Sequence, residues 1–182
     1  MRLHGMSKDA WKRHLPNSIN LKSKFEHYDV SELGMKYNMI DINASIGIEQ
    51  LRKIEKNWKK RKESYNFYIK KLKGLPLLFQ RENPYPSKHG YHLFVIILNK
   101  KKTNKKRDEL IRYLKKYKIA AGINYRCVTD MSYYRKNLNW DKNTSKIAKY
   151  VGDNILSLPL DPKLKKKDII YISTIVKNFF EN

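Results

Sequence analysis

"GMKYNMIDINASIGIEQL", residues 34–51, carries Lys36 and Asn38 just ahead of the point where a helical pattern begins. From Met39 to Leu72, apolar residues recur every three or four positions, and this spacing predicts an amphipathic helix of about nine turns. Polar side chains placed immediately before a helix either cap it or contact a ligand. The pattern alone leaves both interpretations open.

The predicted helix has chemically suitable ends. Asp41 lies near its start, where a negative charge suits the positive end of the helix dipole, and Lys70 and Lys71 lie in its last turn. Gly74, followed by Pro76, supplies a stop. We therefore expect one continuous helix that links the beginning of the chain to the residues after Pro76.

The hydrophobic period changes after this helix. Short β-type runs then alternate with helical patterns, which predicts an α/β chain, α+β in this portion, with a small antiparallel or mixed sheet and helices on one face. The strands are expected at residues 77–80, 91–98 and 154–160, with a further strand-like run at 119–126; the helices are expected at 104–117, 144–153 and 167–180, and a polar loop is expected to contain 132–140.

The beginning of the chain is less regular. Apart from a short helix predicted at residues 7–14, the first part shows little periodicity, and a self-contained domain seldom opens with so long an irregular segment. The chain is therefore expected to begin in the middle of a fold. Its three parts would be an irregular segment at 1–38, the linking helix at 39–74 and a small C-terminal domain at 75–182.

Composition limits the partners. The chain has 182 residues, of which 41% are apolar, so it can form a hydrophobic core. Its formal net charge of +23 would ordinarily indicate nucleic acid or an anionic surface. The lysines are spread along the whole chain, however, and the zinc-finger, RNP and Arg-rich helix patterns of nucleic-acid binders are missing from the sequence. A solvated basic surface is favoured over a nucleic-acid partner.

Residues that could carry chemistry are sparse. The one cysteine, Cys127, cannot form a disulfide within the chain, fits a reducing cytoplasm, and is expected to be buried as a packing residue. Histidines at metal-binding spacing, a glycine-rich phosphate loop and a transmembrane run are not found in the sequence, so we predict neither a metal site nor a membrane segment. The chain offers groups that could contact a ligand but no recognisable catalytic residue.

Five segments resemble, in order and approximate spacing, the DegT/DnrJ/StrS family of nucleotide-sugar aminotransferases. They are RLHGMSKDAWKR (2–13), GMKYNMIDINASIGIEQL (34–51), YHLFVI (91–96), RDELIRYL (107–114) and LSLPLDPKL (156–164). The form KYN followed by DINA looks most like the branch that aminates 4-keto nucleotide sugars for cell-surface polysaccharide or lipopolysaccharide, including the 4-amino-arabinose enzyme.

The resemblance implies an enzyme that uses pyridoxal 5'-phosphate (PLP). In full-length members of the family, the Schiff-base Lys comes before the R-x-H-G segment, which here begins at Arg2. The resemblance therefore implies that these residues form the C-terminal portion alone, without that Lys. Transamination needs the Lys amine to hold PLP and to move a proton, so the chain is expected to be inactive by itself.

The resemblance also suggests why polar residues precede the long helix. In the family, the matching segment reaches across a homodimer interface toward the neighbouring subunit's cofactor phosphate and sugar-nucleotide site, which makes Lys36 and Asn38 the candidate cofactor-binding residues. An ammonium and an amide are suitable phosphate donors. The alternative is that Asn38 merely caps the helix.

Further substrate contacts are implied downstream. His92, Tyr125 and Arg126 match positions near the family's active site, and the Arg126 guanidinium suits a diphosphate. The same loop departs from the family, because Asn124 and Thr129 stand where relatives usually carry His. This departure indicates either a different sugar or relaxed selection.

The leading hypothesis is a C-terminal portion that acts on a UDP-4-keto sugar, with an amino acid, Glu by family habit, as amino donor. Its partner would be the missing N-terminal half or a full-length paralogue, in a truncated or split gene product. A non-catalytic nucleotide-sugar binding module and a basic nucleic-acid-binding protein remain alternatives. Without the large domain, apolar surface would be exposed, so the isolated chain is expected to associate.

Overall fold

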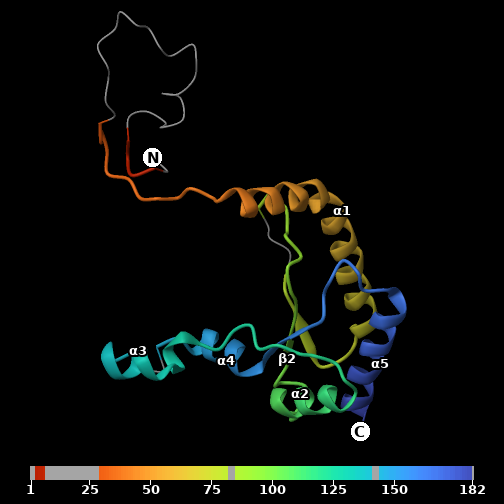
Figure 1. The fold of residues 1–182 in the computed structure, drawn as a ribbon. Helices are drawn as coiled ribbons and strands as arrows, with labels where there is room; N and C mark the ends of the chain where they lie inside the picture. The colour runs from red at the N-terminus through yellow and green to blue at the C-terminus, as the bar shows by residue number, and fades with distance from the viewer. Residues whose placement is uncertain (1–2, 7–28, 82–84, 141–143, 182) are drawn as a thin grey trace, which may run out of the picture. The chain divides into compact units, whose positions relative to one another are not determined.

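The computed structural model describes residues 3–6, 29–81, 85–140 and 144–181 (Figure 1). The chain divides into two compact units, Met1–Lys53 and Ile54–Asn182, which are considered separately. The short helix predicted at 7–14 lies outside the described residues. Among the described residues, none of the helices combines the length and the apolar character needed to cross a membrane.

The long helix is confirmed as α1, Asp41–Leu72. Lys70 and Lys71 lie in its last turn, and Gly74 follows with a φ of +90°, a left-handed conformation that glycine adopts without strain. The side chains that α1 buries all lie in its second half; they are Ser64, Tyr65, Tyr68 and Leu72. The amphipathic pattern is therefore satisfied within this chain only toward the C-terminal end of the helix.

The sheet has three strands, β1 (Leu77–Phe79), β2 (Phe94–Leu98) and β3 (Ile155–Leu158). They are antiparallel in the order β1-β2-β3. This arrangement confirms the prediction of a small antiparallel or mixed sheet. The strand-like run predicted at 119–126 is wrong, because there only Gly122 forms a bridge, with Ser157. A glycine inside a run provides no side chain to pack and weakens strand pairing.

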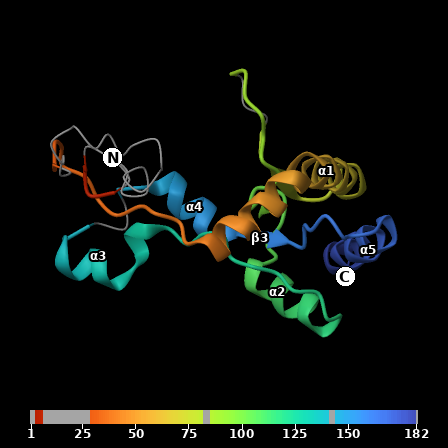
Figure 2. The same ribbon diagram turned by 45° about the horizontal axis from the view of Figure 1, so that its top comes forward.

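Helices cover one face of this sheet and form the core with it. Alternate residues of β2 point into the core, together with the end of α1 and the helices α2 (Arg107–Lys116) and α5 (Lys166–Glu181). Figures 1 and 2 show α2 and α5 side by side. The core side chains with no measurable exposure are Tyr68, Leu72, Phe94, Ile96, Leu98, Leu110, Leu114, Leu156 and Val176.

Tyr68 is the central aromatic residue of that core. Its ring stacks on Phe94 with centroids 4.5 Å apart, and its hydroxyl donates a hydrogen bond of 3.1 Å to the carbonyl oxygen of Pro159. Burial, assisted by the negative charge of Asp168, raises the pKa of Tyr68 well above its ordinary value. The hydroxyl therefore stays protonated as a donor and ties α1 to the segment after β3.

The polar loop predicted around 132–140 contains helices that the sequence did not reveal. A 3-10 turn, η3 (Val128–Asp130), leads into α3 (Ser132–Asn137), and the predicted helix at 144–153 is confirmed as α4 (Lys146–Asn154). Helix α3 buries none of its residues, so its sequence carries no hydrophobic period. An aromatic stack supports it instead, with the rings of Tyr134 and Trp140 5.1 Å apart.

Candidate functional site

The segment with Lys36 is held by backbone pairing in the unit Met1–Lys53. Lys36 forms an antiparallel bridge with Leu3, and the amide of His4 donates to the carbonyl of Met35 at 3.3 Å. Gly5 has a φ of +73°, and a Cβ built there would lie 1.8 Å from the carbonyl oxygen of Glu32. The close approach of Gly5 to the backbone of Glu32 therefore requires glycine. The backbone around Lys36 is positioned by residues from the start of the chain.

Lys36 and Asn38 are both exposed, so their polar groups are accessible to a ligand. Helix α1 begins at Asp41, and the amide of Ala44 donates to the carbonyl of Ile40 at 3.0 Å. Ile40, rather than Asn38, therefore occupies the position next to the first helical residue. This geometry does not support the capping interpretation of Asn38, and its contact with a ligand stays a prediction.

His92 is exposed and lies just ahead of β2. The stretch before it is anchored to α1, because the Trp58 indole nitrogen Nε1 donates a hydrogen bond of 2.7 Å to the carbonyl oxygen of His89. The His89 Nδ1 accepts a hydrogen bond of 3.0 Å from the amide of Tyr91. These two contacts fix the backbone that leads into His92.

Tyr125 and Arg126 are also exposed, with Tyr125 71% accessible. The backbone beside them is supported by α4, where Gly152 makes a close approach: a Cβ built on Gly152 would lie 2.6 Å from the Cys127 amide nitrogen. Cys127 is buried, as predicted, and its Sγ lies 3.0 Å from the Thr129 Oγ1. The candidate side chains therefore project from a loop whose backbone packs against α4.

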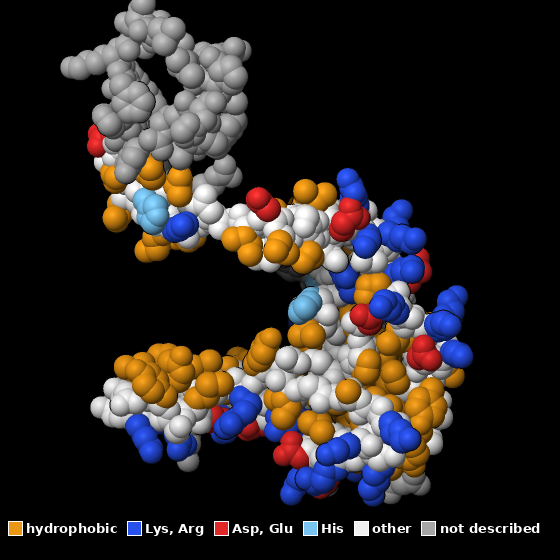
Figure 3. Space-filling view, in the orientation of Figure 1, with side chains coloured by type: hydrophobic (Ala, Val, Ile, Leu, Met, Phe, Trp, Pro, Cys, Tyr) orange, Lys and Arg blue, Asp and Glu red, His pale blue; other side chains and the backbone are white. Residues whose placement is uncertain are grey.

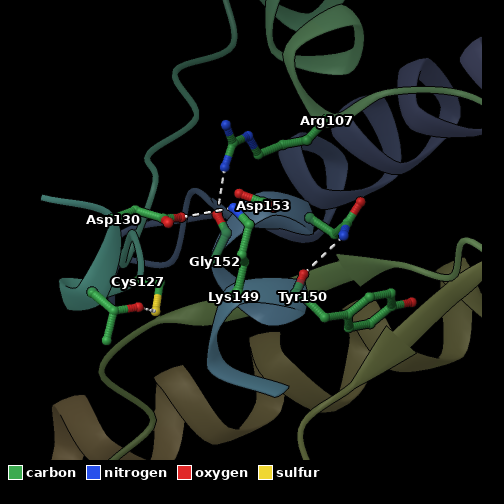
Figure 4. A network of polar contacts seen from close by, with 9 residues as sticks. Arg107, Cys127, Asp130, Lys149, Tyr150, Gly152 and Asp153 are labelled. Carbon is green, nitrogen blue, oxygen red and sulfur yellow. Dashed lines mark hydrogen bonds and ion pairs between the residues drawn. The ribbon is translucent and has the colours of Figure 1, made fainter. Parts of the chain in front are cut away.

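A polar network holds the same loop and α4 together (Figure 4). Arg107 on α2 donates from Nη1 to the Gly152 carbonyl oxygen at 2.6 Å, and Lys149 Nζ lies 2.9 Å from Asp130 and 3.1 Å from Asp153. The hydrogen bond to Asp130, followed by that to Asp153, raises the pKa of Lys149. Lys149 therefore remains a protonated structural cation and does not suit the role of an amine nucleophile.

Replacing Gly152 by alanine tests this support. The added methyl group would meet the Cys127 backbone, so we expect Gly152→Ala to destabilise the fold by about 1–3 kcal/mol. Thermal denaturation followed by circular dichroism measures the change. The matched control is Gly47→Ala in α1, where a Cβ has nothing within 4 Å and should stabilise the helix by up to about 1 kcal/mol. Equal melting of the two variants would contradict the close approach.

The structure distributes the five candidate residues over both units. Lys36 and Asn38 belong to Met1–Lys53, whereas His92, Tyr125 and Arg126 belong to Ile54–Asn182. Sequence reasoning missed Trp58, Gly152 and the other residues that hold the candidates in place. Their partners lie far away in the sequence, so spacing carried no signal for them.

Comparison with known proteins gives consistent matches. A family model described as the DegT/DnrJ/EryC1/StrS aminotransferase family matches residues 1–177. The uncharacterized protein MJ1066 of Methanocaldococcus jannaschii is 34% identical over 177 residues, which are 97% of this chain and 44% of that protein. The spore coat polysaccharide biosynthesis protein SpsC of Bacillus subtilis is 31% identical over 171 residues, 92% of this chain and 42% of SpsC.

Solved structures agree with the family model. The putative sugar aminotransferase Spr1654 from Streptococcus pneumoniae, in its PMP-form, superposes with a TM-score of 0.78 and 26% identity over 99% of this chain and 43% of that one. Helicobacter pylori PseC, an aminotransferase involved in the biosynthesis of pseudoaminic acid, shares the fold with a TM-score of 0.74 at 24% identity, over 99% of this chain and 44% of PseC. The chain spans less than half the length of the relatives it matches, and the matched portion is their C-terminal part.

Proposed function

Because this chain belongs to the DegT/DnrJ/EryC1/StrS aminotransferase family, we propose that it acts as the C-terminal portion of a PLP-dependent enzyme that aminates a 4-keto nucleotide sugar. The observation that carries the proposal is the coverage of the structural match, 99% of this chain against 43% of a sugar aminotransferase. In this proposal, residues 1–38 form the end of the large domain and the cross-dimer arm, 39–74 the linking helix, and 75–182 the small domain.

The described residues suit the contacts to the PLP phosphate but do not supply the lysine that attaches PLP covalently. When bound, PLP supplies the electron sink for amino transfer. Lys36 and Asn38 are exposed next to the start of α1, where an ammonium and an amide suit the cofactor phosphate. Covalent attachment requires an unprotonated amine, and the hydrogen bonds of Lys149 keep that lysine protonated. The resemblance, in which the Schiff-base Lys precedes the R-x-H-G segment, supports placing the attaching Lys in sequence outside these residues.

His92, Tyr125 and Arg126 are proposed to contact the substrate. The Arg126 guanidinium can donate two parallel hydrogen bonds to a phosphate, which suits the diphosphate of a nucleotide sugar. Tyr125 and His92 add a hydroxyl and an imidazole that can bond to sugar hydroxyls. The support of their backbones by α4 and by Trp58 keeps these donors in place without help from the ligand.

The name of one relative supports a broad substrate class. SpsC is named for spore coat polysaccharide biosynthesis, which supports a sugar destined for a surface glycan. The UDP link and the 4-keto group are proposed from the family resemblance. The relatives and solved structures named above do not support the 4-amino-arabinose branch specifically. Glu is the proposed amino donor. The reaction is proposed to take place in the cytoplasm.

The proposed partner is an N-terminal portion that carries the Schiff-base Lys, within a homodimer. Apolar side chains that are exposed to solvent in this chain support such a partner, because a partner would bury them. In Figure 3, hydrophobic side chains gather over α3 and over the first turns of α1. The exposed ones include Ile42, Ile46, Ile48 and Leu51 on α1, and Tyr133, Leu138, Trp140 and Ile147 around α3 and α4.

Complementation tests the proposal. The chain would be mixed with an N-terminal portion that carries the family's Lys, encoded in the same genome, together with PLP, Glu and a UDP-4-keto sugar. We expect the amino sugar, detected by mass spectrometry, in the mixture and not with either part alone. Absence of both product and PLP absorbance in the mixture would contradict the proposal. Affinity of the chain for the UDP-sugar without any gain of activity on mixing would favour a non-catalytic binding module.

A further inference from the structure

Basic and aromatic side chains gather where α2 ends and α5 begins, in the unit Ile54–Asn182. The two helices lie side by side (Figures 1 and 2). Tyr117, directly after α2, is 38% exposed, and Tyr171 on α5 is 49% exposed. Exposed lysines accompany these two tyrosines. We call the following residues the α2–α5 patch: Lys115, Lys116, Tyr117, Lys118, Lys167 and Tyr171.

Contacts between the two helices hold the tyrosines of the patch in place. The Tyr171 hydroxyl donates a hydrogen bond of 3.4 Å to the carbonyl oxygen of Tyr117. The rings of Tyr113 and Tyr117 have centroids 5.1 Å apart, and the ring of Tyr113 also lies 5.5 Å from that of Phe179, which is buried. The aromatic part of the patch is therefore ordered by the fold and needs no ligand to arrange it.

The lysines of the patch lie beside these tyrosines. Three of them immediately flank Tyr117 in the sequence. On α5, Lys167 comes four residues before Tyr171, and residues four apart in a helix lie on the same face. Because the Tyr171 hydroxyl reaches the backbone of Tyr117, the lysines of both helices belong to one surface. The patch therefore combines positive charge with exposed tyrosine rings.

The acidic side chains of the two helices do not neutralise the patch. Asp108 and Glu109 lie in the first turn of α2, whereas three lysines of the patch follow in its last turn and directly after it. Asp168 is partly buried, and its carboxylate accepts a hydrogen bond of 2.9 Å from the amide of Lys165. Glu181 ends α5, whereas the patch lies near its start. The patch therefore carries a local excess of positive charge.

We propose that the α2–α5 patch docks on the surface of an anionic lipid bilayer. Lysines close to such a surface are attracted to its acidic headgroups. Tyrosine favours the boundary between headgroups and acyl chains, because its ring is apolar and its hydroxyl is polar. The patch presents both kinds of side chain together on one surface. The inference concerns where the chain binds, and it does not rest on the proposed function.

Single-stranded nucleic acid is the other polyanion that basic and aromatic groups can bind. Such binding uses rings with a free face on which each base can stack. Here Tyr117 lies against Tyr113, and Tyr113 lies against Phe179, so these rings occupy one another's sides. The Tyr171 hydroxyl is bonded to the backbone of Tyr117. This packing favours the bilayer over a strand of bases.

Flotation of the chain with vesicles on a density gradient tests the patch, because bound protein rises with the vesicles whereas self-associated protein sinks. Vesicles of phosphatidylcholine with about one third phosphatidylserine should bind the chain at least about tenfold more tightly than phosphatidylcholine alone. The double substitution Lys116→Glu and Lys167→Glu should weaken binding to the anionic vesicles at least about tenfold, since it replaces attracted charges with repelled ones. Binding that is no tighter to the anionic vesicles would overturn the proposal.

The charge of the whole chain provides the main rival explanation, since +23 would attract any anionic surface. The matched control is therefore Lys56→Glu with Lys59→Glu, which makes the same charge change at exposed positions on α1, outside the patch. It should weaken binding less than about threefold, because charges away from the contact are screened by salt. Equal weakening by the two double substitutions would show general attraction and overturn the patch.

Tyr171→Ser tests the aromatic contribution without a change of charge. We expect it to weaken binding to the anionic vesicles about threefold or more, because a ring is lost from the interface. Tyr133→Ser is the control, at a tyrosine on α3 that is 66% exposed and lies outside the patch, and it should leave binding unchanged. Equal effects of the two substitutions would overturn the role of the patch. Circular dichroism of every variant checks that the fold is retained.

A nucleic-acid partner is tested with the same variants and a single-stranded RNA. Binding of the RNA that Lys116→Glu with Lys167→Glu weakens, without binding of the anionic vesicles, would assign the patch to nucleic acid and overturn the bilayer. Binding of the anionic vesicles that these two substitutions remove, whatever the result of the complementation experiment, would support the patch.

Discussion

The isolated chain is expected to self-associate in solution, and charges placed on the first half of α1 should reduce this association. Ile48 and Leu51 lie on one side of the helix, one turn apart, and are 52% and 67% exposed. Ile42 and Ile46, on other sides of the same turns, are exposed as well. Exposed apolar side chains on more than one side of a helix favour contact with other protein surfaces, so this part of α1 is suited to an interface in a larger assembly.

Size-exclusion chromatography with light scattering measures the effect. The double substitution Ile48→Glu and Leu51→Glu should shift the chain strongly toward the monomer mass, because two carboxylates cannot be buried in an apolar contact without a large desolvation cost. Ile170→Glu is the control, at a position on α5 that is 44% exposed and lies outside the uncovered part of α1. A sharp monomer peak and cooperative melting of the unmodified chain would contradict the uncovered surface.

Substituting Phe94 by alanine should cause the largest loss of stability in the unit Ile54–Asn182. Phe94 has no measurable exposure and stacks on Tyr68, while Tyr65 meets its ring edge-on at 4.9 Å. Removing a buried aromatic ring leaves a cavity and costs about 3–5 kcal/mol. Such a loss approaches the whole stability of many domains of this size, so a large fraction of the variant should be unfolded at room temperature.

Urea denaturation followed by far-UV circular dichroism gives the free energy of unfolding for this comparison. Phe180→Ala is the matched control, since Phe180 packs against the core but is only partly buried. It should cost less than half as much, because fewer contacts and less buried area are lost. Comparable losses for the two phenylalanines would contradict the central position of Phe94.

The sequence predicted those parts of the fold that carry a clear apolar run or a regular hydrophobic period. A short apolar run revealed β2, and apolar residues spaced three to four apart revealed α1 and α2. Helix α3 escaped because it buries nothing, and the run at 119–126 misled because apolar residues surround Gly122 without forming a ladder. Local patterns therefore failed where tertiary packing, rather than periodicity, determines structure.

The candidate site was accessible to sequence reasoning only through family resemblance. Lys36, Asn38 and Arg126 are ordinary exposed polar residues, and their spacing carries no chemical signature. The features that support them come from distant residues, as when Trp58 reaches the carbonyl of His89, 31 positions later. Spacing within a motif does not report such contacts.

The central claim is that these residues complete an aminotransferase whose cofactor-attaching Lys lies in another portion of sequence. It is tested most directly by titrating a fixed amount of the Lys-bearing N-terminal portion with this chain while measuring PLP-dependent formation of the amino sugar. The account predicts that activity rises in proportion to added chain and saturates at one chain per N-terminal portion. Activity of the N-terminal portion that is already maximal without this chain, or that stays at zero throughout the titration, would contradict it.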